Sequence, residues 1–414
     1  MKGVVIAAGE GKRLKPLTQT RPKCMIPVAG KPILHHVLEN LKSAGIRHVV
    51  IVVNYLKHKI IDEFGDGRKI GMKIEYAVQE KMRGTADAFL AAEEMIDDTF
   101  VGIASDVITE SSAIKKLISS HDSEMTVGLK KVDDVSNYGA AEIERGRIVK
   151  LEEKPKSHRS GLANCSMYVM NENIFSKIKS LSLSERGEYE ITDLIKMLAR
   201  SGDARGVELK EYWQDLGMPW QLFDANEFLL NKMKAKKDGK IENSRVTGKV
   251  IMEKGASISD SVVEGPIFIG KNTEIGPHSF IRGNSSIGED CSISDSTTVK
   301  NSIIMSHVNA KHLTYIGDSI VGENCNFGAG TQIANWRFDA GTITMEVMNR
   351  RVDTKRSKLG VIIGDNTKTG VLSSIMPGRT IGDNCWIGAG VVVDRDIPRG
   401  TRVFVKQRLK FERQ

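Results

Sequence analysis

Residues 4–33 read VVIAAGEGKRLKPLTQTRPKCMIPVAGKPI, an apolar run followed by a turn of small residues. The run predicts a first β-strand, and Ala8 and Gly9 in the turn let backbone N–H groups approach an anion closely. Arg13 and Lys23 follow the turn. Because phosphoryl transfer requires mainly positioning and charge neutralisation, a guanidinium and an ammonium at this place favour a polyphosphate-binding loop. A glycine-containing turn alone is weak evidence, since many loops after a first strand have this composition.

Outward from this stretch, residues 1 to about 220 alternate short β-branched runs with helix-like stretches. These lie at residues 3–7, 33–44, 48–53, 74–78, 86–95 and 99–103. This order predicts βαβ units in a Rossmann-like α/β domain, with a mixed, mainly parallel sheet and helices on both faces. Ligands of such sheets bind at the carboxyl ends of the strands. We place this domain at 1–225, followed by a helical, lysine-rich linker at 226–245.

From residue 246 to 414 the pattern changes, and aliphatic residues followed by glycine or serine recur in steps of six or its multiples. Ile258 and Ile316 are one residue out of register with their neighbours. Clear examples are Ile269-Gly270, Ile275-Gly276, Ile287-Gly288, Ile381-Gly382 and Ile387-Gly388. An aliphatic residue at every sixth position can point inward on successive faces of a prism, which predicts a parallel β-helix of hexapeptide repeats. The spacing gives no handedness, and the usual rule for parallel crossovers favours a right-handed one.

Residues 336–360 interrupt the repeats, because WRFDAGTITMEVMNRRVDTKRSKLG contains no six-residue step. We expect this insertion to project as a loop, and projecting loops of solenoids often carry function.

The bulk composition indicates an ordinary globular protein. A chain of 414 residues, 40% apolar and 27% charged, exceeds what one core usually supports, so we expect two domains. The apolar runs are too short to span a bilayer or to form a signal peptide, so we expect a cytoplasmic protein without a membrane partner. The net charge is +8, but basic residues are scattered among acids, which disfavours nucleic acid as a partner.

The cysteines are Cys24, Cys165, Cys291, Cys325 and Cys385. Their odd number and lack of paired spacing predict neither a disulfide framework nor a zinc site. We expect them to be small buried thiols.

The N-terminal stretch resembles the signature of the sugar-1-phosphate nucleotidyltransferase family, L-A-A-G-x-G-x-R-L-x-P-L-T followed by P-K-x-x-x-P-V and K-P. The match runs from Ile6 to Pro32, and the resemblance continues in order over about 220 residues. It implies that a nucleoside triphosphate and a sugar 1-phosphate react to give a nucleoside diphosphate sugar and pyrophosphate. The sugar phosphate attacks the α-phosphorus in line, without a covalent enzyme intermediate.

The resemblance also assigns nucleotide and metal positions. Arg13 and Lys23 fall on the contacts to the triphosphate and the transition state. The nucleotide-binding positions are Ala8 and Gly9 in the backbone cradle, Gln79 at the pyrimidine edge, and Gly84 and Thr85 in the base pocket. The two magnesium-binding aspartates correspond to Asp106 in IASDVI and Asp215 in YWQDLGMPW. Two carboxylates suit a hard, oxygen-preferring cation.

The sugar-phosphate positions are Gly139 in NYGAAE, Glu153 and Lys154 in LEEKP, and Asn164 in GLANCSMYVM. The family's N-A-G-I-Y reads NCSMY here, so Cys165 and Ser166 crowd a position that is normally small. Taken one at a time, these residues also have structural explanations without a function. Asp106 could cap the following turn, and Glu153 and Lys154 could form an exposed ion pair. Their co-occurrence in order favours the functional interpretation and leaves the exact sugar open.

Residues 311–335, KHLTYIGDSIVGENCNFGAGTQIAN, resemble the acetyltransferase half of bacterial and archaeal bifunctional enzymes that make UDP-N-acetylglucosamine. H-L-x-Y-x-G-D, N-x-G-A-G-T and a further asparagine recur there in this order. The archaeal type resembles this chain over nearly its whole length. The resemblance implies a left-handed β-helix in place of the right-handed default, a homotrimer, and active sites between neighbouring subunits.

This second resemblance implies acetyl transfer from acetyl-CoA to the amine of glucosamine 1-phosphate or a similar amino sugar. The amine loses a proton as it attacks, and histidine suits that step near neutral pH, so His312 is assigned as general base. The other positions are Tyr315, Asn326 and Asn335 at the substrate and acetyl group, Arg282 and Lys300 at the sugar phosphate, Lys358 or Lys355 in the inserted loop, and Ala389 at CoA. A basic tail either meets CoA phosphates or is a solvated end; its cations are Arg402, Lys406, Arg408 and Lys410.

Three functions stay open from the sequence. The first is a bifunctional enzyme that acetylates an amino-sugar 1-phosphate and couples the sugar to UTP or dTTP. The second is a glucose or mannose 1-phosphate nucleotidyltransferase whose β-helix only oligomerises or regulates. The third is a noncatalytic assembly subunit like those of the translation-initiation exchange factor. The intact nucleotidyltransferase residues disfavour the third, and the motif around His312 favours the first. The choices between UTP and dTTP and between gluco and galacto sugars stay open, since Gln79 reads an edge that both bases share.

Overall fold

The computed structural model describes residues 1–412, and its internal contacts divide the chain into two compact units. Unit one comprises Met1–Glu10, Arg21–Met25 and Pro32–Leu216. Unit two comprises Gly11–Thr20, Ile26–Lys31 and the chain from Gly217 onward. Two pieces of the N-terminal signature are therefore part of the compact unit that contains the repeats.

Unit one is built on a nine-stranded mixed sheet in the order β5-β4-β1-β6-β11-β8-β12-β10-β9. Its strands are β1 (Lys2–Ala7), β4 (His48–Val53), β5 (Lys73–Val78), β6 (Phe100–Ala104), β8 (Met125–Val132), β9 (Gly139–Glu144), β10 (Arg147–Glu153), β11 (Gly161–Met170) and β12 (Ala204–Glu208). β5, β4, β1 and β6 are mutually parallel, as are β8 and β12, while β9, β10 and β11 pair antiparallel with their neighbours. Short two-stranded ribbons are β7 (Val107–Thr109) with β13 (Trp213–Asp215), and β2 (Pro27–Val28) with β3 (Lys31–Pro32).

Helices cover both faces of this sheet, as predicted, because alternate strand residues enter two different cores. In β4, Val49 and Ile51 pack with α1, α2 and α4, whereas Val50 and Val52 pack with α3, α5 and α6. The helices are α1 (Ile33–Ser43), α2 (Lys57–Phe64), α3 (Thr85–Leu90), α4 (Ser111–Ser119), α5 (Ile174–Lys179) and α6 (Ile191–Ser201), with 3-10 turns η1 (Lys12–Leu14), η2 (Lys23–Met25), η3 (Arg68–Ile70) and η4 (Glu93–Met95). Among residues 1–412, no helix is long and apolar enough to cross a membrane.

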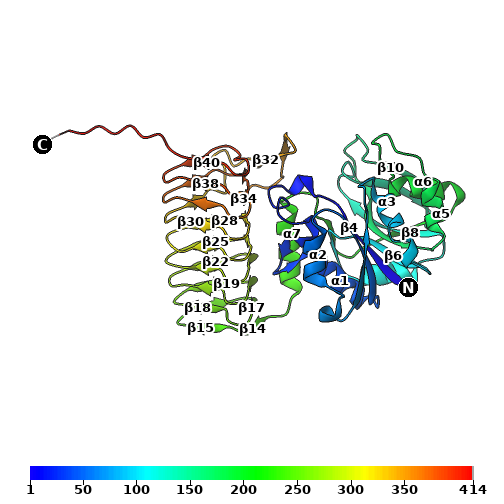
Figure 1. Cartoon of the computed structure of the whole chain (residues 1–414), viewed down its shortest axis with the longest axis horizontal. Coiled ribbons are helices and arrows are strands. Elements are labelled where there is room, and N and C mark those ends of the chain that lie inside the picture. The colour runs from blue at the N-terminus through cyan, green and yellow to red at the C-terminus, as the bar shows by residue number, and fades with distance from the viewer. Residues whose placement is uncertain (413–414) are drawn as a thin grey trace. The chain divides into compact units, whose positions relative to one another are not determined.

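Unit two contains α7 (Gln221–Lys232) and the predicted parallel β-helix, whose three sheets the chain visits in turn (Figure 1). The first sheet contains β14 (Lys236–Lys237), β17 (Val250–Met252), β20 (Ile267–Ile269), β23 (Ser285–Ile287), β26 (Ile303–Ile304), β29 (Ile320–Val321), β34 (Val361–Ile363) and β37 (Arg379–Ile381). The second contains β15 (Lys240–Glu242), β18 (Ser257–Ser259), β21 (Glu274–Ile275), β24 (Ser292–Ile293), β27 (Asn309–Ala310), β30 (Asn326–Phe327), β35 (Lys368–Thr369), β38 (Trp386–Ile387) and β40 (Arg402–Val403). The third contains β16 (Arg245–Thr247), β19 (Val262–Glu264), β22 (Phe280–Arg282), β25 (Thr298–Lys300), β28 (Tyr315–Gly317), β31 (Gln332–Ile333), β36 (Ser374–Ile375) and β39 (Val392–Val393).

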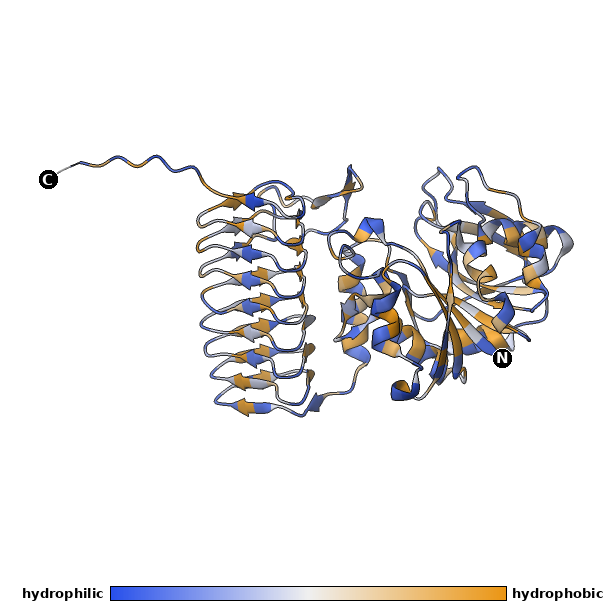
Figure 2. Cartoon of the chain, viewed as in Figure 1, coloured by the Kyte–Doolittle hydropathy of each residue, from blue (hydrophilic) through white to orange (hydrophobic). Residues whose placement is uncertain are grey.

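The coils stack with a period of 17 or 18 residues, except for the coil that contains the insertion and the last coil, in which Ile387 pairs with Val403, 16 residues on. Ile258 pairs with Ile275, 17 residues on, and Ile275 pairs with Ile293, 18 residues on. The inward aliphatic residues form one continuous core, and hydrophobic segments recur from coil to coil in Figure 2. A 17-residue coil is one residue short of three hexapeptides, which explains the register slips at Ile258 and Ile316. Many corners carry Asn or Asp at positive φ, a left-handed conformation that these short polar side chains tolerate.

The insertion at 336–360, which was predicted to project as a loop, contains a two-stranded ribbon. β32 (Thr344–Val347) and β33 (Arg350–Asp353) pair antiparallel within this insertion. Stacking resumes across it, because Ile320 of β29 pairs with Ile362 of β34.

The β-helix begins earlier than residue 246. α7 ends at Lys232 and β14 starts at Lys236, so helix and first coil occupy most of the stretch predicted as linker. The side chains of β14 are exposed and those of β15 are mostly exposed. The terminal coil of a solenoid has a polar outer side. The aliphatic residues that mark the repeat are therefore scarce in this coil, and the sequence pattern did not reveal it.

All five cysteines are buried free thiols, as predicted. Burial raises the pKa of Cys24 to about 12 and that of Cys291 to about 11, so both are neutral near pH 7.

β11 contains a bulge between Asn164 and Tyr168, where its register with β8 shifts. Ser166 lies in this bulge with a φ of 56°, in the left-handed region that favours glycine. The glycine of the family pattern N-A-G-I-Y therefore matches a backbone requirement at this position. Serine adopts this conformation at a cost in free energy.

Ser166→Gly is expected to raise the free energy of unfolding by about 0.5–1 kcal/mol, because glycine relieves the left-handed strain. Urea denaturation followed by circular dichroism measures this change. Ser180→Gly is the matched control, because Ser180 has a right-handed φ of −88° and its replacement should destabilise. Equal destabilisation by both changes would contradict the strain at Ser166.

Candidate functional site

The signature turn lies at the carboxyl end of β1, where ligands of parallel sheets bind. Ala8 is buried, and a Cβ added to Gly9 would meet no neighbouring heavy atom within 4 Å, so the space beside Gly9 is open. Lys23 begins η2 in unit one, whereas Arg13 lies on η1 in the segment Gly11–Thr20 of unit two. Gly11 opens η1 in the left-handed conformation, with a φ of 69°.

Lys23 lies beside two carboxylates in unit one. It forms an ion pair with Asp106, and its Nζ atom is 4.0 Å from Oδ1 of Asp215. The β7–β13 ribbon creates this arrangement by placing Asp215 opposite Val107, directly after Asp106. The two aspartates are 20% and 29% exposed, so solvent and ligands can reach them. The structure thus brings together one predicted catalytic cation and both predicted metal ligands.

Cys24 follows Lys23 and is buried beside this cluster. Its thiol is fully enclosed, and burial, with the nearby Asp106 charge, raises its pKa despite a hydrogen bond with Ser105. A neutral, enclosed thiol is neither a nucleophile nor a metal ligand.

One of the predicted base-binding residues, Gln79, borders a cavity of about 370 Å³ in unit one. Gln79 lines it, is 4% exposed, and donates from Nε2 to Oδ2 of Asp87 at 2.8 Å. Gly84 has a φ of 115°, and a Cβ there would lie 2.4 Å from the Tyr189 carbonyl oxygen, so glycine is required. Thr85 uses its hydroxyl as an acceptor for Ile191 N at 3.0 Å. Gln79 therefore lines the cavity, whereas Gly84 and Thr85 are not among its lining residues; Gly84 contacts Gln79 by accepting a hydrogen bond from its Nε2 at 3.2 Å.

The predicted sugar-phosphate residues meet where β9, β10 and β11 join. Gly139 pairs with Glu153, and a Cβ on Gly139 would lie 3.2 Å from Oε2 of Glu153 and 3.6 Å from Cβ of Asn164. Glu153 also lies 3.5 Å from Nζ of Lys154 and 3.3 Å from Nη2 of Arg186. The four predicted residues therefore form one corner of unit one, and Arg186 is an additional cation there.

Asp318 is the centre of a polar cluster in unit two. Its Oδ2 atom accepts a hydrogen bond from Asn335 at 2.6 Å and lies 3.5 Å from Nζ of Lys300, while Oδ1 accepts from Asn301 at 2.7 Å. Asn335 also donates to the Tyr315 hydroxyl at 3.3 Å. The Asp318 side chain is 7% exposed, so these donors compensate a nearly buried charge.

His312 lies at the corner between β27 and β28, with Nδ1 2.7 Å from Oδ2 of Asp295. Asp295 occupies the same corner one coil earlier, and its carbonyl accepts from Leu313 N at 2.9 Å. A carboxylate at Nδ1 favours the proton on that nitrogen and leaves Nε2 as the basic atom. The side chain is 57% exposed, so Nε2 is accessible.

Other predicted residues are distributed along the same β-helix. Arg282 pairs with Lys300, and Lys300 with Gly317, so the two cations stack on the third sheet beside Asp318. Ala389 lies at the corner between the second and third sheets, which also carries His312. Successive hydrogen bonds follow this corner, from Gly330 N to His312 O, from Leu372 N to Ala329 O, and from Gly390 N to Val371 O.

Two predicted residues lie apart from the Asp318 cluster. Asn326 belongs to β30 on the second sheet, where it pairs with Asn309 and Lys368. Lys358 is exposed and bridges Trp336 at the base of the insertion.

The sequence interpretation missed Asp295 and the role of Asp318. Asp318 lies inside the quoted motif HLTYIGD, but no role was assigned to it. Asp295 precedes His312 by 17 residues, so the length of one coil was the signal that could have identified it.

Three protein families match successive parts of the chain. The Nucleotidyl transferase family matches residues 2–232, the GMPPB C-terminal domain matches 262–358, and the bacterial transferase hexapeptide family (six repeats) matches 360–395. Together with the sheets described above, they confirm the predicted fold class, an α/β nucleotidyltransferase domain followed by a left-handed parallel β-helix.

Similar proteins cover the whole chain. It is 41% identical over 416 residues to the "Bifunctional protein GlmU" of Methanocaldococcus jannaschii, with 100% of both chains covered. It is 35% identical to a "Bifunctional sugar-1-phosphate nucleotidylyltransferase/acetyltransferase" of Sulfurisphaera tokodaii, covering 97% of this chain and 99% of the relative. A crystal structure of a Bacillus anthracis protein assigned as a glucose-1-phosphate thymidylyltransferase matches with a TM-score of 0.52 and 31% identity, over 57% of this chain and 98% of that one.

Proposed function

Because the chain belongs to the Nucleotidyl transferase family and matches bifunctional relatives along its whole length, we propose that it catalyses two group transfers. One joins a sugar 1-phosphate to UTP or dTTP and gives a nucleoside diphosphate sugar and pyrophosphate. The other transfers acetyl from acetyl-CoA to the amine of a glucosamine-type sugar 1-phosphate. Together they would supply an N-acetylated nucleoside diphosphate sugar such as UDP-N-acetylglucosamine. A cytoplasmic location stays a prediction from the sequence.

One observation carries this proposal, namely that each unit contains its own charged cluster. Unit one places Lys23 beside Asp106 and Asp215. Unit two places His312 on Asp295, and Lys300 with Asn335 on Asp318. The first set suits a polyphosphate with a cation, and the second suits deprotonation of an amine next to a bound phosphate.

In nucleotidyl transfer, a sugar-phosphate oxygen forms a bond to the α-phosphorus and the bond from that phosphorus to the α–β bridging oxygen breaks. The attacking phosphate is already an anion, so no protein base is needed. Lys23 and Arg13 would neutralise the charge that collects on the triphosphate and on leaving pyrophosphate, while backbone N–H groups at Ala8 and Gly9 hold the phosphates. Gly139, Glu153, Lys154 and Asn164 would bind the sugar phosphate.

Asp106 and Asp215 would hold a divalent ion, for which magnesium is suited because both side chains offer carboxylate oxygens. The ammonium of Lys23 lies beside both carboxylates, so this pair accommodates positive charge at the place where the ion would bind. The bound ion would stabilise negative charge on the α-phosphate and the leaving group.

In acetyl transfer, the amine nitrogen attacks the thioester carbonyl, a C–N bond forms, and the C–S bond breaks. His312 would take the amine proton at Nε2, and CoA leaves as a thiolate that acquires a proton. Asp295 would orient the ring through Nδ1. Lys300 and Arg282 would bind the sugar phosphate, Tyr315, Asn326 and Asn335 would position the acceptor and the acetyl group, and Lys358 and Ala389 would contact CoA.

An apolar strip follows the corner that carries His312. Leu313, Val371, Leu372 and Val392 are 64%, 49%, 71% and 56% exposed on or beside it. Exposed aliphatic side chains gathered along one corner are unfavourable in water and are typical of an interface. We infer a homotrimer whose subunits meet along this corner, so that each His312 lies next to a neighbouring subunit.

Lys23→Ala is expected to lower pyrophosphate release by about a hundredfold or more while acetyl transfer continues at the wild-type rate. His312→Ala is expected to do the reverse, by about a hundredfold or more. Released pyrophosphate and free CoA thiol measure the two activities. They should be measured with four nucleoside triphosphates and with plain, amino and N-acetyl sugar 1-phosphates, each with and without acetyl-CoA.

Lys115→Ala is the control for these variants, because Lys115 is exposed on α4 and belongs to neither cluster. It should leave both activities intact. Full acetyl transfer by His312→Ala would refute the base mechanism. Wild-type protein with pyrophosphate release but no acetyl transfer would instead support a single-activity enzyme whose β-helix oligomerises or regulates.

Asp295→Asn is expected to lower kcat of acetyl transfer by about tenfold or more and to leave nucleotidyl transfer unchanged. The amide can donate to Nδ1 and so favours the tautomer in which Nε2 carries the proton, as in hydrolase triads. The pH–rate profile of acetyl transfer measures the effect. An unchanged profile and rate would show that the Asp295 contact is not used.

Leu372→Glu is expected to shift the protein from a trimer toward monomers, because it places charges at the proposed interface. Sedimentation velocity measures the mass, and Leu183→Glu is the control, since Leu183 is an exposed apolar residue of unit one. Acetyl transfer should fall with the loss of trimer. A wild-type protein that sediments as a monomer would overturn the proposed assembly.

A further inference from the structure

The segment Gly11–Thr20, which carries Arg13, ends on two stacked aspartates of the β-helix in unit two. Asp365 and Asp383 each follow an Ile-Gly step of the first sheet, and Ile363 pairs with Ile381, so the aspartates lie one coil apart. They are 5% and 0% exposed. A buried carboxylate is unfavourable unless hydrogen bonds compensate the charge.

The compensating donors come from the end of this segment. Thr20 donates from Oγ1 to Oδ2 of Asp365 at 2.6 Å. Gln19, in the amide orientation that satisfies both of its polar ends, donates from its nitrogen to the two oxygens of Asp383 at 2.8 and 3.1 Å. Nε of Arg399 lies 3.8 Å from Oδ2 of Asp383 and adds positive charge.

The aspartates themselves are held against the coil before them. Oδ1 of Asp365 accepts from Glu323 N at 2.8 Å. A Cβ on Gly322 would lie 2.5 Å from Oδ1 of Asp365, and a Cβ on Gly364 would lie 2.3 Å from Oδ1 of Asp383. Each carboxylate therefore packs over a glycine, where a larger residue would displace it. The pair offers fixed acceptors to Thr20 and Gln19.

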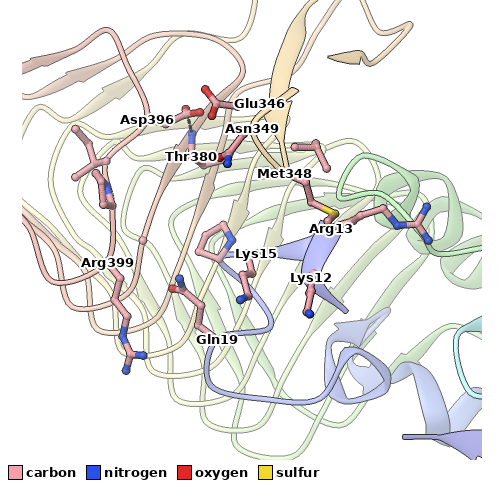
Figure 3. Close-up of a pocket in the computed structure, with 15 residues that line it drawn as sticks. Lys12, Arg13, Lys15, Gln19, Glu346, Met348, Asn349, Thr380, Asp396 and Arg399 are labelled. Carbon is pink, nitrogen blue, oxygen red and sulfur yellow. Dashed lines mark hydrogen bonds between the residues drawn. The ribbon is translucent and has the colours of Figure 1, made fainter. Parts of the chain in front are cut away.

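The segment is short and internally bonded, so fixing its end constrains its whole course. Thr18 donates from Oγ1 to the Gly11 carbonyl at 2.9 Å, and Leu14 N donates to the same carbonyl at 2.9 Å. Gln19 N donates to Pro16 O at 3.0 Å. Figure 3 shows Lys12, Arg13 and Lys15 of the segment around a cavity of about 470 Å³, with Asn349 and Arg399 of the β-helix unit also lining it.

We propose that Asp365 and Asp383 are positioning residues for nucleotidyl transfer. Through Thr20 and Gln19 they hold the segment that presents Arg13, so the β-helix is a required part of the first activity as well as the scaffold of the second. This inference rests on the proposed function, because it assigns Arg13 to the triphosphate. Neither aspartate touches a reacting atom.

The test uses full-length Thr20→Val and Gln19→Met, which remove the donors and keep approximate side-chain size. Both are expected to lower kcat of pyrophosphate release about tenfold, with KM for the sugar phosphate within about twofold, because a displaced Arg13 loses transition-state contact while sugar binding is retained. Thr20→Ser keeps the hydroxyl and should restore kcat. Acetyl transfer by the same preparations should stay at the wild-type rate.

Thr367→Val is the matched control for lost stability. It removes a buried hydroxyl that donates to Gly382 O at 2.8 Å within the β-helix but does not touch the segment. It should lower the thermal midpoint and leave kcat unchanged. Wild-type kcat and KM in both Thr20→Val and Gln19→Met would overturn the positioning role while leaving the proposed function intact. A wild-type protein that releases no pyrophosphate would overturn the proposed function and this inference together.

Discussion

The stacking of 17- and 18-residue coils is the constraint on which the rest of unit two depends. One coil alone would leave its inward aliphatic residues in water, so each coil needs a neighbour on either side. These inward residues set the register, and every outward side chain then lies over a residue one coil away. Residues one coil apart in the sequence therefore become neighbours in space. Examples are His312 with Asp295, and Lys300 with Arg282.

Local patterns could predict much of unit one because strands and helices each carry their own periodicity. The runs at 33–44 and 48–53 correspond to α1 and β4 for this reason. The proximity of Asp106 and Asp215 could not be predicted in this way, because it depends on the β7–β13 ribbon, which distant parts of the chain form. No local pattern encodes that pairing, and only the family resemblance indicated that both carboxylates serve one site.

The features that the sequence did not predict depend on contacts between distant residues or on exposed polar side chains. Six-residue steps carry no information on hand, so only the general rule for parallel crossovers favoured a right-handed β-helix, and the family resemblance implied the left-handed one. The start at Lys236 was missed because the end coil is polar, and the ribbon within 336–360 was missed because its pairing lies outside the repeat. Asp295 was missed because its partner is one coil away, a distance that is known only once the coil length is known.

The tripeptide Ile-Gly-Asp has different interaction partners in different sheets of the β-helix. It occurs at 316–318 at the end of a strand of the third sheet, and at 363–365 and 381–383 at the ends of strands of the first. Each aspartate is nearly buried, and an apolar residue there would avoid the cost of desolvating a charge. A buried charge, however, requires hydrogen-bond partners in a defined geometry, whereas an apolar contact does not.

Asp318 binds Lys300 and Asn335 on the face that carries Tyr315. Asp365 and Asp383 instead bind Thr20 and Gln19, at the end of the segment Gly11–Thr20. The same tripeptide therefore orders different groups on the two sheets, according to which partners the coil register brings within reach.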